Sequence, residues 1–87
     1  MDDDIRPLLA ELEAAIRRSR ADGRIDEGEA EELRALIGRV ERALAERAGH
    51  DGIVDRLEAT AVRFEGDHPR LAATLRSVVD TLTAAGI

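Results

Sequence analysis

Residues 21–29 read ADGRIDEGE and separate two helix-forming segments. Glycine adopts the left-handed backbone conformation that ends many helices, so Asp22-Gly23 predicts the end of the first helix. Asp26, followed three residues later by Glu29, resembles a capping box with aspartate in place of serine and predicts the start of the second helix. We expect Ile25 to fill the core between the two helices. The stretch therefore predicts a tight turn between antiparallel helices.

Apolar residues recur at spacings of three and four on both sides of this turn, which is the pattern of amphipathic helices. The two stripes are Ile5, Leu8, Leu9, Leu12 and Ile16 before the turn, and Leu33, Leu36, Ile37, Val40 and Leu44 after it. Two further stripes flank a break at Gly66-Asp67-His68-Pro69; they are Ile53, Val54, Leu57, Ala61 and Phe64, then Leu71, Leu75, Val78, Val79 and Leu82.

These stripes predict four helices, at roughly residues 3–21, 26–48, 52–65 and 68–85. The connections are short, so helices that follow one another should pack antiparallel. We expect an all-α fold, either a small antiparallel helical bundle or two helical hairpins, in a single domain over residues 1–87.

The composition limits the class of protein. The chain has 87 residues, no cysteine and one aromatic residue, Phe64. Disulfides and thiolate metal sites are therefore excluded, and a sheet, which draws on aromatic and β-branched residues, is not favoured. The net charge of −6 argues against nucleic-acid binding, which needs a basic face.

The sequence gives no sign of export or of membrane insertion. The acidic start, Met1-Asp2-Asp3-Asp4, lacks the basic and apolar regions of a signal peptide, and no stretch approaches the roughly 20 apolar residues that span a membrane. We expect a cytoplasmic protein that does not contact membranes. A chain this short has a thin core, so self-association is an expected source of stability.

The last segment carries a stripe of small uncharged residues beside its apolar stripe: Thr74, Ser77, Thr81 and Ala84. A helix that faces water over half of its circumference usually carries more charge. One interpretation is that this helix is buried on two sides, at the centre of the fold or in a contact between subunits. The other is that these hydroxyls lie in solvent.

The Asp22–Glu29 turn also matches the second half of a calcium-binding loop. The first half does not match, because Arg18 and Arg20 stand where calcium needs carboxylates. Two histidines, His50 and His68, each lie beside an aspartate, but their spacing matches no known zinc motif. We therefore expect no metal or cofactor, and keep a divalent-cation or small-ligand binder at this turn as the alternative function.

Four arginines near the first turn, Arg17, Arg18, Arg20 and Arg24, precede an acidic group, Glu27, Glu29, Glu31 and Glu32. One hypothesis makes them a docking patch for a charged partner. The other makes them exposed ion pairs that complement the helix dipoles. No nucleophile motif or phosphate-binding glycine loop is present, so catalytic residues are not predicted and the protein is not expected to be an enzyme.

The C-terminal part carries a further pattern: a phenylalanine-acidic-x-x-His-Pro segment at Phe64, Glu65, His68 and Pro69, and a final Gly86-Ile87. In this pattern the chain resembles the short bacterial proteins of domain-of-unknown-function family 4404, and the resemblance covers most of its length. It implies a small helical protein and no activity, since the family is uncharacterised. It makes the four residues of the segment candidates for a functional role.

We therefore expect a non-enzymatic protein that acts through helix faces, in protein–protein interaction or self-assembly. The expected partner is another protein or a second copy of the chain.

Overall fold

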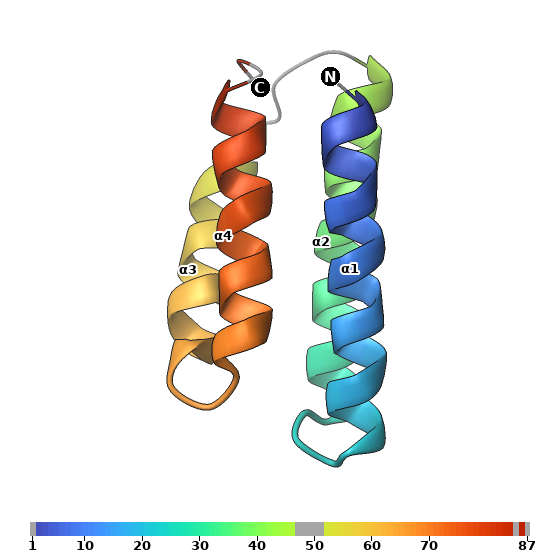
Figure 1. Ribbon diagram of the computed structural model, residues 1–87, viewed down its shortest axis with the longest axis vertical. Helices are drawn as coiled ribbons and strands as arrows, with labels where there is room; N and C mark the ends of the chain where they lie inside the picture. The colour runs from blue at the N-terminus through green and yellow to red at the C-terminus, as the bar shows by residue number, and fades with distance from the viewer. Residues whose placement is uncertain (1, 47–51, 85, 87) are drawn as a thin grey trace.

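The computed structural model describes residues 2–46, 52–84 and 86, and these fold into four helices. They are α1 (Asp2–Ala21), α2 (Glu27–Glu46), α3 (Ile53–Glu65) and α4 (Pro69–Ala84). The helices run alternately down and up, so the α1–α2 and α3–α4 turns lie at the same end of the molecule (Figure 1). The described residues contain no strand. The predicted all-α antiparallel bundle is confirmed.

The first turn ends α1 and begins α2 through two local hydrogen-bonded motifs. Gly23 has a φ of 72°, and the N–H groups of Gly23 and Arg24 donate to the carbonyls of Arg20 (3.0 Å) and Ser19 (2.9 Å), which is a Schellman motif. Asp26 Oδ1 accepts from the Glu29 N–H at 2.7 Å. Glu29 Oε1 accepts from the Asp26 N–H at 3.0 Å. The predicted capping box is therefore confirmed, with aspartate in the serine position.

The second turn brings α4 back along α3. The His68 N–H donates to the Phe64 carbonyl at 2.7 Å, and the His68 carbonyl accepts from the Ala72 N–H at 3.0 Å. Pro69 is the first residue of α4, a position that has no need of an N–H and suits the fixed φ of proline. The break predicted at residues 66–69 is therefore a tight turn between two helices.

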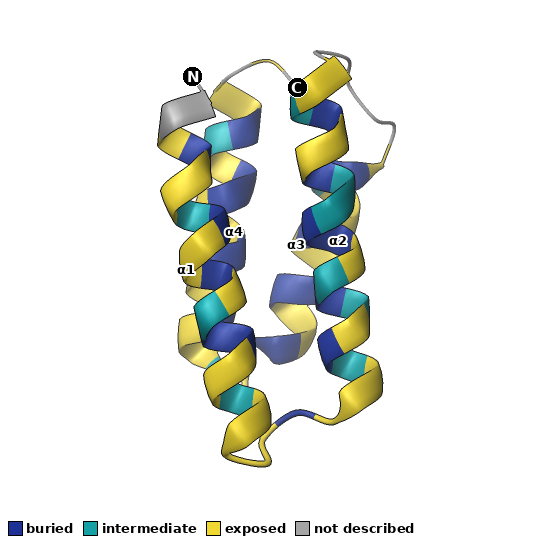
Figure 2. Ribbon diagram, turned by 90° about the vertical axis from the view of Figure 1, so that its right-hand side faces the viewer, coloured by how far each residue is buried: buried dark blue, intermediate teal, exposed yellow. Residues whose placement is uncertain are grey.

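The four predicted stripes point into one common core (Figure 2). Ile25 of the first turn, only 4% exposed, also lies in this core, as expected. α4 packs against both α3 and α1, while α2 completes the ring by packing against α1 and α3. Three residues of the predicted stripes are only partly buried and pack against this core: Leu8, Leu44 and Val54. The fourth helix thus contacts two neighbouring helices, as each of the other three does.

Two bidentate ion pairs join neighbouring helices on the outside. Arg63 of α3 contacts both carboxylate oxygens of Glu32 of α2, at 3.0 and 2.7 Å. Arg76 of α4 contacts both oxygens of Glu65 of α3, at 3.1 and 2.9 Å. Both pairs are exposed, so they orient the helices more than they stabilise them.

Each helix begins within one residue of its predicted start, and α1 and α3 end at the predicted residues 21 and 65. Residues 47, 48 and 85, predicted as helical, lie outside the described residues, and so do His50 and Asp51. Among the described helices, none combines the length and apolar character that crossing a bilayer requires.

A candidate cationic pocket at the turn end

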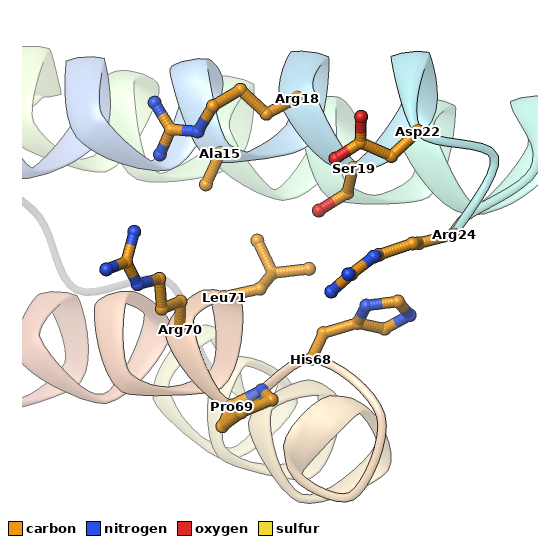
Figure 3. Close-up of a pocket in the computed structure, with 9 residues that line it drawn as sticks. All are labelled: Ala15, Arg18, Ser19, Asp22, Arg24, His68, Pro69, Arg70 and Leu71. Carbon is orange, nitrogen blue, oxygen red and sulfur yellow. The ribbon is translucent and has the colours of Figure 1, made fainter.

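Because both turns lie at the same end of the bundle, the residues around them line a half-open pocket of about 440 Å³ between α1 and α4 (Figure 3). Its lining residues come from α1, the first turn, the second turn and the start of α4: Ala15, Arg18, Ser19, Asp22, Arg24, His68, Pro69, Arg70 and Leu71. The pocket therefore joins the two segments that the sequence singled out, although they are more than 40 residues apart.

The first hairpin positions its lining residues through the end of α1. Ala15, Arg18 and Ser19 are three and four residues apart, so they share the face of α1 that looks toward α4. Arg24 follows the left-handed Gly23, and its N–H is bonded to the Ser19 carbonyl. This Schellman bond returns the chain toward α1 and brings the Arg24 side chain to the same cavity as Ser19.

The second hairpin positions the opposite wall. The half-buried His68 lies with its ring centroid 5.7 Å from that of Phe64, at an interplanar angle of 52°. Phe64 is buried in the core, so it anchors the histidine at the pocket wall. Pro69, Arg70 and Leu71 form the first turn of α4, where the helix dipole is positive.

Three guanidinium groups line the pocket, and among the described residues none of them forms an ion pair. They belong to Arg18, Arg24 and Arg70. By contrast, Arg20, which lies just outside the lining, pairs with Glu27. Asp22 supplies the one carboxylate of the lining. With histidine neutral, the described lining thus has a formal charge of +2 in a chain whose net charge is −6.

The charged groups divide into two sets. Figure 3 shows the guanidiniums of Arg18 and Arg70 on one side of the Leu71 side chain, and Arg24 with His68 and the Asp22 carboxylate on the other. Ala15, Pro69 and Leu71 supply apolar surface between and beneath these groups. Such a site can hold anionic groups through charge-assisted hydrogen bonds, and arginine favours carboxylate or phosphate oxygens bidentately.

The family-signature residues have distinct positions in the structure. Phe64 is buried in the core, and the Arg63 guanidinium lies 4.9 Å from its ring centroid. Glu65 pairs with Arg76, and this hydrogen-bonded pair lowers the pKa of Glu65. Of the four signature residues, only His68 and Pro69 line the pocket.

The predicted arginine cluster is divided by the fold. Arg18 and Arg24 line the pocket, whereas Arg17 and Arg20 do not. The acidic group opposite them is divided too, because Glu27 pairs with Arg20, Glu29 belongs to the capping box, and Glu32 pairs with Arg63. The hydrogen bond from Arg63 lowers the pKa of Glu32.

The carboxylates proposed for a cation at the first turn have other contacts. Asp26 and Glu29 accept each other's backbone N–H, and Asp22 lines a pocket dominated by arginine. Across the described part of the chain, no three His, Cys, Asp or Glu side chains are grouped as a metal ion would need. His50 lies outside that part. Asp26 and Glu29 are thus engaged in capping α2, and a cation at this turn stays a prediction.

The small-residue stripe of α4 is partly buried. Thr74 is buried, Thr81 is half-buried, and Ser77 and Ala84 are exposed. The hydroxyls of Thr74, Ser77 and Thr81 each donate to a carbonyl four residues earlier in the same helix. Only part of the stripe is thus available to a second copy of the chain.

Fold and pocket together define a small antiparallel four-helix bundle with a cationic pocket at its turn end. The family model described as a domain of unknown function (DUF4404) matches residues 5–87, and the chain belongs to this family. The resemblance that the sequence indicated is therefore confirmed. No curated protein and no solved structure matches the chain significantly.

Proposed function

We propose that the protein is a non-enzymatic protein–protein interaction module, and that another protein docks at the turn end of its bundle. The observation that carries the proposal is the convergence of Arg18, Arg24 and Arg70 on one cavity while none of them pairs with a described carboxylate. Arginine is enriched at protein interfaces and their hot spots. A cytoplasmic location belongs to the same proposal, and cell fractionation tests it.

The grouping of three guanidinium groups on one cavity supports the choice of this end. The arginines that pair with Glu27, Glu32 and Glu65 have their charge matched within the chain. The pocket arginines keep their hydrogen-bond donors for a partner. Because the chain is acidic overall, the positive charge of the pocket lining is a local attraction for an approaching acidic segment.

The test is a capture experiment with two triple variants of equal net charge. The pocket variant is R18Q/R24Q/R70Q, and the control is R17Q/R39Q/R42Q, whose arginines lie outside the pocket lining. We expect the tagged wild-type chain and the control to retain the same protein stoichiometrically from a lysate of the source cells, and the pocket variant to lose it. Retention of that protein by the pocket variant would refute the proposal.

A further inference from the structure

We propose that the pocket receives a short extended acidic segment of the partner protein, with two carboxylate side chains separated by one residue. The inference rests on the proposed function, since it takes the turn end as the docking surface and names the chemistry of what docks there. It follows from the charge of the pocket and from the arrangement of its cationic groups.

The charge of the lining sets the number of anionic groups. Arg18, Arg24 and Arg70 exceed the single carboxylate of Asp22 by two charges. Arginine stays protonated at all relevant pH values, so this excess is permanent. Two carboxylates neutralise it, whereas a single carboxylate leaves one guanidinium unmatched.

The arrangement sets the spacing of those groups. Figure 3 shows Leu71 between Arg18 and Arg70 on one side and Arg24, His68 and Asp22 on the other. A single compact anion therefore bonds one of the two cationic sides and leaves the arginine of the other without a ligand. In an extended peptide, side chains two positions apart project from the same face, about 7 Å from each other. An acid-x-acid segment therefore presents one carboxylate to each side.

The apolar residues of the lining can also contact the proposed acid-x-acid segment. Leu71 and Ala15 are buried residues whose edges reach the cavity, and Pro69 is exposed at its rim. Glutamate methylene groups can lie on this surface while their carboxylates reach the arginines. Ser19 adds a hydroxyl to the same wall. The pocket thus offers both apolar contact and charge to an acidic side chain.

The experiment is a titration of the full chain, labelled with ¹⁵N, with capped peptides, followed by NMR of the backbone amides and arginine Nε–H groups. The probe peptide contains Glu-Ser-Glu between Gly-Ser ends. Matched peptides contain Gln-Ser-Gln, which removes the charge, or Glu-Glu-Ser, which places the two acids on opposite faces. Inorganic phosphate, at the same ionic strength, is the competing ligand.

We expect the Glu-Ser-Glu peptide to shift the signals of Ser19, Arg24 and Leu71, and to bind about tenfold more tightly than the Gln-Ser-Gln peptide. The Glu-Glu-Ser peptide should bind more weakly than Glu-Ser-Glu. R24Q and R70Q should each weaken binding about tenfold, while R17Q on the same end changes it little. Circular dichroism checks that each variant is folded.

Several outcomes overturn the inference. The inference fails if the three peptides bind equally or if none of them binds. It also fails if R17Q loses as much peptide affinity as R24Q and R70Q, or if phosphate produces the same shifts at a lower concentration than the Glu-Ser-Glu peptide. If the captured partner is lost in R18Q/R24Q/R70Q but no acidic peptide binds, the inference fails and the proposed function stands. If the peptide binds but no partner depends on the pocket, the proposed function fails instead.

Discussion

Gly23 supplies the backbone conformation on which the first turn depends. Its φ is 72°, and an added Cβ would meet no heavy atom within 4 Å. The Gly23→Ala substitution therefore tests the backbone alone, because alanine in the left-handed region costs about 1–2 kcal/mol. We expect the free energy of unfolding to fall by about that amount, as measured by urea denaturation followed by circular dichroism.

Gly38 provides the matched control for this substitution. It lies inside α2, and a Cβ there also meets no atom within 4 Å. Since alanine is the better helix former, Gly38→Ala should raise the free energy of unfolding by about 0.5–1 kcal/mol. Effects of the same sign at both glycines would contradict the Schellman motif at Gly23.

Asp26, the residue before α2, caps this helix with its side chain as well as with its backbone. Removing that side chain in Asp26→Ala leaves the Glu29 N–H without its acceptor, and should lower the free energy of unfolding by about 1 kcal/mol. The control is Glu29→Gln, because the amide oxygen can still accept from the Asp26 N–H. Thermal and urea unfolding measure both variants, and equal destabilisation of the two would exclude a reciprocal box.

At the scale of elements, α3 is tied to its neighbours by the two bidentate ion pairs. Arg63 and Arg76 lower the pKa of Glu32 and Glu65 by hydrogen bonding. A lowered folded-state pKa means that the stabilisation is complete above the ordinary glutamate pKa of about 4.3, and is lost as the pH falls through the folded value. We expect urea midpoints to fall between pH 5 and pH 3.

Glutamine substitutions separate the contribution of the two ion pairs to the pH dependence of stability from that of the other carboxylates. In E32Q/E65Q the part of the pH dependence due to these pairs should disappear, so the variant approaches the wild type in stability at pH 3 and is less stable at pH 7. The change is small, since solvent screens exposed ion pairs. E31Q, at an exposed carboxylate with no ion pair to the described residues, is the control and should keep the wild-type slope.

The helices could be predicted from the sequence because their information is local. The stripes, the Asp22-Gly23 break and the Asp26–Glu29 box all act within a few residues, and each predicted a feature that the structure contains. Which face of a helix meets the helices of the other hairpin depends on residues far apart in the sequence, so it cannot be read from a local pattern. For this reason Glu32, which the sequence groups with the acidic residues after the first turn, pairs with Arg63 of α3.

The pocket shows the same limit. Arg18 and Arg24 could be selected from the sequence as members of a cluster, and His68 and Pro69 as members of a signature. Arg70 was missed, because nothing in its own segment shows that α4 begins beside the end of α1. Its one available signal was its position directly after the His-Pro break, at the positive end of a predicted helix.

For the whole molecule, stability rests on one small core. Leu75 is fully buried in it, so Leu75→Ala should lower the free energy of unfolding by about 2–5 kcal/mol through lost contacts and a cavity. That is a large part of the roughly 5–15 kcal/mol of a small domain. The control is Val62→Ala, because Val62 is 63% exposed and should change stability little. Urea denaturation compares the two, and similar losses would contradict the assigned core.

Self-association through the α4 stripe is the remaining prediction for the whole molecule, and the residues of the stripe that a second copy could reach are Ser77, Ala84 and the half-buried Thr81. Ser77 is an exposed member of that stripe, so Ser77→Arg places a charge in the contact and should convert an oligomer into the 9.5 kDa monomer. Thr83, exposed about 120° further around the same helix, gives the control Thr83→Arg. Light scattering at rising concentration measures the mass. A wild-type chain that stays monomeric, or equal dissociation by both substitutions, would rule out self-assembly through this stripe.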